Sequence, residues 1–409
     1  MPLQSCASFR RTYSKRINCI ALSSCLRYVA TGANELAVWE VGDATKEACI
    51  IPTGEPILCL SWIESSSVGW TLACGLQNGV LLTLSFNRNT ANITAFQQPA
   101  QASPISALSQ YLSGGHLVTG GRSDGCVLWL REGEEWAKKA SFLDGQNCPP
   151  VVHIQPLGSQ TFLAILFKDG GLVCLSMETE EFLWDANVDT HIFAAGLPIT
   201  PQGLALVTMK HRGEIRFHYS DDVANSESDM IQVSARVIHH ARLGGPIAWL
   251  SPDFVLVGGN NGANADVWDV KSGRIVEHLN HDGGVIQAVA SSFHPQSGLS
   301  CVATIVQENG HSIVRVWESV RDGSAWEYMA TSTDTHIPVR AVLSPGIQLS
   351  CSQRPSGPVT PESSRSSSLC HRVMFTFALV AVAFAVFSGG HSYGPLQEAQ
   401  RRFFGLRNA

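Results

Sequence analysis

Three observations predict an all-β fold made of repeated sheets. Hydrophobic residues make up 44% of the 409 residues, which provides enough apolar side chain for a sizeable core. Charged residues make up only 15%, and 10 Trp residues are present, a combination typical of β-rich proteins. The third observation is that segments with one common outline recur along the chain. Each holds three short apolar strands joined by polar turns.

The recurring segments predict how many sheets there are. The clearest copies lie at residues 17–41, 103–130 and 245–270, and weaker copies fill the intervals. The third strands close at Trp39, Leu84, Trp129, Cys174, Phe217, Trp268 and Trp317. The steps between these positions are about 43 to 51 residues, near the interval of four-stranded propeller blades. Because one such sheet cannot bury both faces alone, we predict a seven-bladed β-propeller of four-stranded antiparallel blades over residues 1–350.

Over about residues 17–343 the chain resembles the WD-repeat β-propeller family, with a degenerate signature. Only the sixth repeat closes in the literal WD pair, Trp268 and Asp269. The resemblance implies that these two residues are structural. It also implies a closed ring, because family members often pair an N-terminal strand with the last blade. Residues 5–13 could supply this strand, and residues 326–333 are the alternative.

The seventh repeat comes nearest to the blade-locking hydrogen-bond network of that family. His281 stands four residues before Val285, Thr304 lies in the second strand, and Trp317 closes the third. The resemblance implies that His281, Thr304 and Trp317 are structural residues. The family's turn Asp is replaced by Asn309, so only part of the network is expected.

One catalytic pattern is present in the third repeat. Residues 121–125 read GRSDG, which fits the GxSxG nucleophile motif of serine hydrolases. That motif needs a strand, a strained turn and a helix, whereas CVLWL, which follows here, has a strand pattern. We therefore interpret Ser123 as a turn residue. The 14 His have no metal-ligand spacing, so we expect no catalytic residue, metal, cofactor or small-molecule substrate.

The turns between second and third strands give the candidate binding residues, because in propellers these turns gather at one end of the axis. Their basic residues all come from repeats three to five: Arg122, Lys168, Lys210, His211 and Arg212. Asp124 and Asp169 partly offset this charge. A basic surface of this kind steers acidic partners. The formal net charge of −6 gives no general attraction to phosphate backbones, so we predict protein partners with acidic surfaces and no nucleic acid.

The C-terminal part departs from the repeats. Residues 351–372 are rich in Ser and Pro and lack aromatic residues, which predicts a disordered linker. Residues 373–390 carry no charge and would span about 27 Å as a helix, near the short end of membrane-spanning segments. We predict a transmembrane helix there, followed by a short polar tail at 391–409. A buried core element is the alternative, since Val and Phe also favour strands.

Together these features predict a non-enzymatic protein-interaction scaffold, tethered to a membrane by its C-terminal anchor. No secretory signal precedes the repeats. A single-pass, tail-anchored protein with the propeller in the cytosol is therefore expected, at the endoplasmic reticulum in preference to the mitochondrial outer membrane. A propeller followed by one membrane span also resembles the layout of the endoplasmic reticulum exchange factor that loads the vesicle-coat GTPase. That resemblance implies an alternative function, guanine-nucleotide exchange, although no matching exchange motif is found.

Overall fold

The computed structural model describes residues 3–319 with internal gaps, and all of these residues belong to one unit, Met1–Ile347. The gaps are 12–15, 42–48, 65–68, 88–92, 112–114, 134, 144–147, 158–161, 169–170, 178, 180, 188–194, 197–203, 210–213, 221–233, 241–245, 252, 259–263, 282, 295–298 and 309–310. Across the described residues the chain forms strands β1–β28 and no helix.

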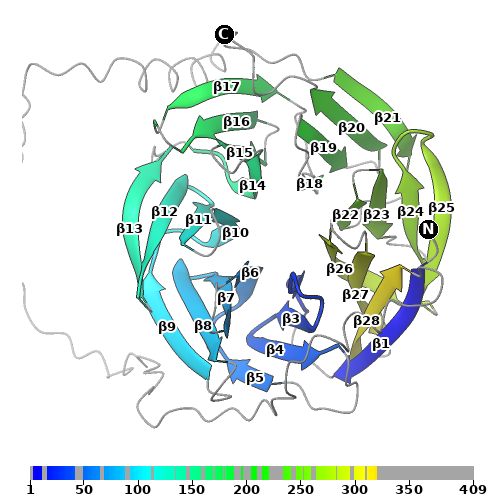
Figure 1. Ribbon diagram of the computed structural model, residues 1–409, viewed down its shortest axis with the longest axis horizontal. Coiled ribbons are helices and arrows are strands. Elements are labelled where there is room, and N and C mark those ends of the chain that lie inside the picture. Colours follow the sequence, from blue (N-terminus) through cyan, green and yellow to red (C-terminus); the bar gives the residue numbers. More distant parts are fainter. Residues whose placement is uncertain are drawn as a thin grey trace, which may run out of the picture. The chain divides into compact units, whose positions relative to one another are not determined.

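The strands pair into four-stranded antiparallel sheets arranged around a common axis (Figure 1). Blade 1 contains β2 (Cys19–Leu22), β3 (Tyr28–Gly32), β4 (Glu35–Glu40) and β5 (Cys49–Pro52). Blade 2 contains β6 (Ile57–Glu64), β7 (Gly69–Leu76), β8 (Val80–Asn87) and β9 (Ile93–Pro99). Blade 3 contains β10 (Ile105–Tyr111), β11 (His116–Gly121), β12 (Cys126–Glu132) and β13 (Glu135–Phe142).

The remaining sheets repeat the same order. Blade 4 contains β14 (Val151–Leu157), β15 (Phe162–Phe167), β16 (Gly171–Ser176) and β17 (Phe182–Asn187). Blade 5 contains β18 (Ala195–Gly196), β19 (Leu204–Met209), β20 (Glu214–Ser220) and β21 (Ser234–His240). Blade 6 contains β22 (Ile247–Ser251), β23 (Phe254–Gly258), β24 (Asn264–Asp269) and β25 (Arg274–Asn280). Blade 7 contains β26 (Val285–His294), β27 (Leu299–Glu308), β28 (His311–Ser319) and β1 (Leu3–Arg11).

The first strand of each blade is the innermost one, and these strands contact one another in a closed circuit. β2 contacts β6, and the contacts continue through β10, β14, β18, β22 and β26 back to β2. Among the described residues, the pairings give seven four-stranded sheets around the ring. The prediction of an all-β propeller with four-stranded antiparallel blades is confirmed.

The core lies between neighbouring blades. One buried cluster joins blades 7 and 1, through Phe9, Trp39 and Ile305 among others, and another joins blades 1 and 2, through Ile51, Ile57 and Leu84 among others. Burial of apolar side chains between the blades whose side chains are described is the main stabilising contribution to this arrangement. No blade could bury these side chains alone.

Close approach between blades explains the small residues that end the second strands. A Cβ atom on Gly75 would lie 2.7 Å from Cγ2 of Ile105, which begins the next innermost strand. A Cβ on Gly120 would lie 2.5 Å from Cγ1 of Val151, at the equivalent place one blade further on. Both distances are shorter than a Cβ contact allows, so any larger residue at these positions would force the neighbouring blade to shift.

The N-terminal strand closes the ring. β1 pairs antiparallel with β28, from Leu3 opposite Ser319 to Arg11 opposite Ser312, and becomes the outer strand of blade 7 (Figure 1). Phe9 on β1 stacks on Trp39 of blade 1 with ring centroids 5.7 Å apart. Of the two predicted closing strands, the N-terminal one makes this pairing. Residues 326–333 lie outside the described part.

The predicted linker (351–372), transmembrane helix (373–390) and polar tail (391–409) also lie outside the described residues. Within the part that is described, no helix has the length and apolar character needed to cross a bilayer.

Candidate interaction surface

The seventh blade contains the predicted His, Thr and Trp in mutual contact. His281 Nε2 lies 2.8 Å from Thr304 Oγ1, and Trp317 Nε1 donates to the same oxygen at 3.3 Å. His281 Nδ1 lies 2.7 Å from the carbonyl of Leu279. All of these side-chain atoms are buried. The arrangement ties the loop before β26 to the second and third strands of its blade, which is a structural role.

The literal WD pair lies at the end of β24. Trp268 is buried against Val255 and Val257. Asp269 Oδ1 accepts a hydrogen bond of 2.7 Å from the backbone N–H of Ser272 in the turn to β25. This hydrogen bond is the main cause that lowers the pKa of the Asp269 carboxyl.

The GRSDG segment is a strand–turn–strand connection from β11 to β12. Ser123 Oγ donates to Asp124 Oδ1 at 3.0 Å, and Gly125 has φ of +68°, which favours glycine. A Cβ on Gly125 would also meet the carbonyl oxygen of Phe142 at 2.3 Å. A strand follows the turn where the nucleophile motif needs a helix, so the interpretation of Ser123 as a turn residue is confirmed.

Sequence reasoning missed two polar groups that hold this turn and its blade. Ser103 Oγ accepts from the backbone N–H of Arg122 at 3.1 Å and of Ser123 at 3.2 Å. Asp124 Oδ2 in turn accepts from the Ser103 N–H at 2.6 Å. Thr119 Oγ1 accepts from Trp129 Nε1 at 3.0 Å, as Thr304 does from Trp317 in blade 7.

These contacts put the loops before the first strands and the turns between second and third strands at the same end of the blades. We call this end the turn face. The backbone N–H groups of Gln77, Arg122 and Lys168 donate to the carbonyls of Pro56, Pro104 and Pro150, at 2.9, 3.1 and 2.8 Å respectively. Blades 2, 3 and 4 are therefore built alike there. A Pro directly before Ile or Val, repeated at this interval, is the sequence signal that could have revealed the pattern.

The structure describes two of the five predicted binding residues. Arg122 and Lys168 are both exposed and occupy equivalent positions on adjacent blades of the turn face. Lys210, His211 and Arg212 lie outside the described residues, so the blade 5 part of the basic surface stays a prediction. Ser123, next to Arg122, is exposed as well.

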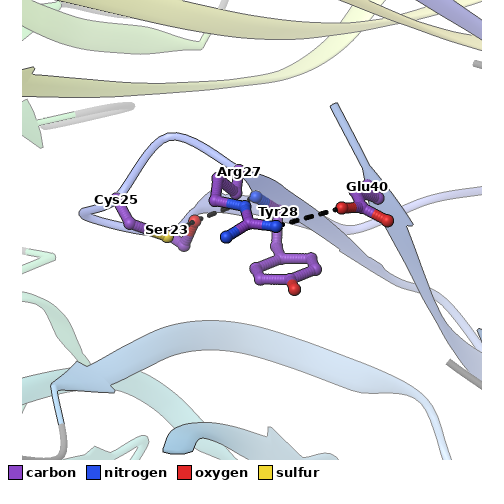
Figure 2. Close-up of polar contacts among 5 residues, drawn as sticks. All are labelled: Ser23, Cys25, Arg27, Tyr28 and Glu40. Atoms are coloured by element: carbon purple, nitrogen blue, oxygen red, sulfur yellow. Dashed lines mark hydrogen bonds and ion pairs between the residues drawn. The ribbon is translucent and has the colours of Figure 1, made fainter. Parts of the chain in front are cut away.

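A second polar cluster lies at the opposite end of blade 1, in the turn from β2 to β3 (Figure 2). Ser23 Oγ accepts from the Tyr28 N–H at 3.0 Å and lies 3.3 Å from Cys25 Sγ. Arg27 donates to Glu40 at 3.4 Å, and its guanidinium stands 6.0 Å from the centre of the Tyr28 ring. The contacts run between neighbouring strands and fix the turn, which indicates a structural role.

The described residues contain no arrangement typical of a metal site. No group of three or more His, Cys, Asp or Glu residues among the described ones could hold a metal ion. The described cysteines are free thiols. Burial raises the pKa of Cys59 to about 12 and lowers the pKa of His153 to about 4, so the thiol is protonated and the imidazole neutral at pH 7.

Comparison with known proteins supports the fold. No family model and no curated protein matches the sequence. The chain is similar to the crystal structure of the β-propeller domain of Cps50 (Swd1) from Myceliophteria thermophila, with a TM-score of 0.55 at 13% identity. The match covers 75% of this chain and 98% of that one. At this identity the likeness shows a β-propeller fold, while membership of the WD-repeat family and the tail anchor stay predictions.

Proposed function

We propose that the protein is a non-enzymatic interaction scaffold that recruits acidic protein partners through the turn face of its propeller. The observation that carries the proposal is the shared construction of blades 2, 3 and 4, which places Arg122 and Lys168 at equivalent exposed positions. A rigid sheet frame with exposed turns is suited to binding, because the turns can vary while the frame holds them in place.

Charge supports an acidic partner. The carboxylate nearest to Arg122 in sequence, Asp124, already accepts hydrogen bonds from the Ser103 N–H and the Ser123 hydroxyl. Its charge is thus directed into the turn. The guanidinium of Arg122 and the ammonium of Lys168 extend from a protein of formal net charge −6, and this local contrast favours carboxylates on a partner. Lys210, His211 and Arg212 would extend the surface to blade 5.

The membrane tether is the second part of the proposal. It is supported by the uncharged composition of residues 373–390 and by the Ser- and Pro-rich residues 351–372 before them. A linker of about 20 residues reaches roughly 25 Å, which would keep the propeller close to the bilayer. Carbonate extraction of membranes and protease protection test this part. A chain that stays wholly in the soluble fraction would contradict it.

Affinity capture tests the recruitment of partners. The double variant Arg122→Glu/Lys168→Glu is expected to lose most of the proteins that the native chain captures. Lys138→Glu/Lys139→Glu changes the net charge equally on the exposed part of β13 and serves as the control, with an expected set like that of the native chain. An unchanged set for the first variant would contradict the proposal. Nucleotide release from the vesicle-coat GTPase separates the scaffold from the alternative exchange factor, since faster release with the purified chain would favour the alternative.

A further inference from the structure

We propose that the turn face binds an extended protein segment in which an apolar side chain is flanked by carboxylates. The apolar side chain rests on Pro104, which lies between Pro56 and Pro150 of the neighbouring blades, and the carboxylates meet Arg122 and Lys168. We call these three prolines the proline row. This inference rests on the proposed function and specifies the chemistry of the partner.

The proline row lies at the inner side of the turn face. Each of its members directly precedes an innermost strand, β6, β10 or β14, and these three strands contact one another in sequence. All three prolines are partly exposed. The residues that follow them, Ile57, Ile105 and Val151, are completely buried between the blades, so on each of these blades a partly exposed apolar residue stands directly before a buried one.

The backbone of the proline row has few hydrogen-bonding groups for a polar ligand. Proline has no N–H to donate. Each of the three carbonyls already accepts the hydrogen bond from the turn of its own blade. The pyrrolidine ring is apolar, and an apolar side chain of a partner gains free energy by covering the exposed part of the proline.

The same region of blades 6 and 7 is apolar too. Pro246 precedes β22 and also accepts a turn hydrogen bond, from the Gly258 N–H at 2.9 Å. Val285 begins β26 and is 48% exposed, the largest exposure among the large hydrophobic residues that the structure describes. Blade 1 differs, because the exposed Arg16 precedes Ile17 there.

A second row lies next to the first and is polar. Gln77, Arg122 and Lys168 are exposed, and each is joined through its backbone N–H to one proline of the proline row. The hydrogen bonds therefore fix a polar residue beside an apolar one on three consecutive blades. An apolar centre with a polar rim is the usual anatomy of a protein interface.

The order of charges along the polar row gives the segment a direction. Blade 2 presents the uncharged Gln77, and blades 3 and 4 present Arg122 and Lys168. Carboxylates of the partner are therefore expected over blades 3 and 4 and a neutral polar residue over blade 2. Phosphate groups of a nucleic acid would also meet the cations, but nucleotides would gain less from the proline row.

The test uses the full chain and fluorescent peptides in anisotropy titrations. The first peptide has a central leucine with a pair of glutamates on each side, and its counterpart has serine in place of the leucine. We expect the leucine peptide to bind about tenfold more tightly than the serine peptide, since full burial of a leucine side chain is worth about tenfold to a hundredfold and the proline row covers part of it. Arg122→Glu/Lys168→Glu is expected to weaken both peptides about tenfold or more. Lys138→Glu/Lys139→Glu is the matched charge control.

The proline row is tested separately by Pro104→Ser, which keeps the backbone carbonyl. This variant should lose the preference for leucine over serine while still binding acidic peptides. Pro246→Ser in blade 6 is the control and should keep the preference for the leucine peptide. Circular dichroism confirms that each variant is folded. Comparing the leucine and serine peptides on the native chain also tests the apolar contact, and this comparison needs no variant.

The possible outcomes separate the two proposals. If charge reversal weakens binding and leucine outperforms serine, both proposals are supported. If charge reversal weakens binding but the two peptides bind equally, the apolar contact is overturned and the acidic partner stands. If charge reversal changes nothing, the acidic partner is overturned and this inference with it. A single-stranded oligothymidine that binds more tightly than the leucine peptide, with the same dependence on Arg122 and Lys168, would overturn the inference in favour of a nucleic acid.

Discussion

The imidazole of His281 and the hydroxyl of Thr304 form a buried hydrogen bond with a defined direction. The Leu279 carbonyl can only accept, so the Nδ1 atom of His281, 2.7 Å away, carries a proton. In the neutral ring Nε2 is then an acceptor, and Thr304 Oγ1, 2.8 Å away, donates to it. The Thr304 oxygen is left to accept the N–H of Trp317. One hydroxyl therefore joins a loop and two strands.

Thr304→Val removes that hydroxyl at nearly constant volume. Both His281 Nε2 and Trp317 Nε1 lose a buried partner, so we expect the free energy of unfolding to fall by about 2 to 4 kcal/mol. Urea denaturation measures this change. Thr119→Val leaves only Trp129 Nε1 without its partner and should cost about half as much. Equal losses for the two variants would contradict the role assigned to His281.

Gly75→Ala tests the close approach between blades 2 and 3. The new Cβ would lie 2.6 Å from Cys59 Sγ and 2.7 Å from Ile105 Cγ2, so the blades must move apart. We expect a loss of about 1 to 3 kcal/mol, seen as a lower midpoint of thermal unfolding. A Cβ on Gly115 meets nothing within 4 Å, and Gly115→Ala is the control. A Gly75 variant as stable as this control would show that the contact is not tight.

Phe9→Ala tests the closure of the ring. Phe9 is buried and stacks on Trp39, so its loss opens a cavity between β1 and blade 1. We expect the free energy of unfolding to fall by about 3 to 5 kcal/mol. Limited proteolysis should also cut β1 faster. Ser8→Ala changes the exposed neighbour on the same strand and should leave both measurements as in the native chain.

Glu318→Gln tests a buried carboxyl in blade 7. Burial raises the pKa of Glu318 above its ordinary value of 4.5. The resulting contribution to stability is fully present below pH 4.5 and is lost as the pH rises through the folded-state pKa. The stability of the variant relative to the native chain should therefore increase as the pH rises from 4 toward 7. The free energy of unfolding, measured across that pH range, checks this trend, and Glu135→Gln at an exposed position is the control. A difference between variant and native chain that stays constant with pH would contradict it.

Ser123 should not react as an activated nucleophile. Its hydroxyl donates to Asp124 in a turn that leads into a strand. Incubation with a fluorophosphonate probe, followed by mass spectrometry of the peptide that contains Ser123, is expected to show no adduct. Labelling that disappears in Ser123→Ala would revive the hydrolase interpretation.

The architecture could be predicted because the blades whose side chains are described repeat one burial pattern. Of the seven closing positions, the six whose side chains are described are all buried in third strands: Trp39, Leu84, Trp129, Cys174, Trp268 and Trp317. The sequence pattern predicts the hydrogen-bonded Thr only in blade 7, because the strands between Thr and Trp are longer in blade 7 than in blade 3 and this changes the spacing of the two residues along the chain. Thr119 lies 10 residues before Trp129, whereas Thr304 lies 13 before Trp317.

The two Thr residues occupy equivalent positions in the strand register, although their separation from the Trp along the sequence differs. Thr119 pairs with Val127 and Thr304 with Arg315, in each case two residues before the Trp. The hydrogen bonds from turn amides to Pro56, Pro104 and Pro150 were missed for a similar reason. They join residues about 20 positions apart whose proximity depends on the folded blade. The choice between two closing strands could not be made either, because both sequences have the composition of a strand.

The pairing of β1 with β28 has a consequence for synthesis of the chain. A ribosome releases residues 3–11 long before it makes residues 311–319, yet these segments complete one sheet. The earliest strand must therefore wait, with its edge uncovered, while the other blades are translated. An edge strand that stays unpaired during this delay is a site of aggregation, so aggregation of the incomplete chain competes with closure of the ring.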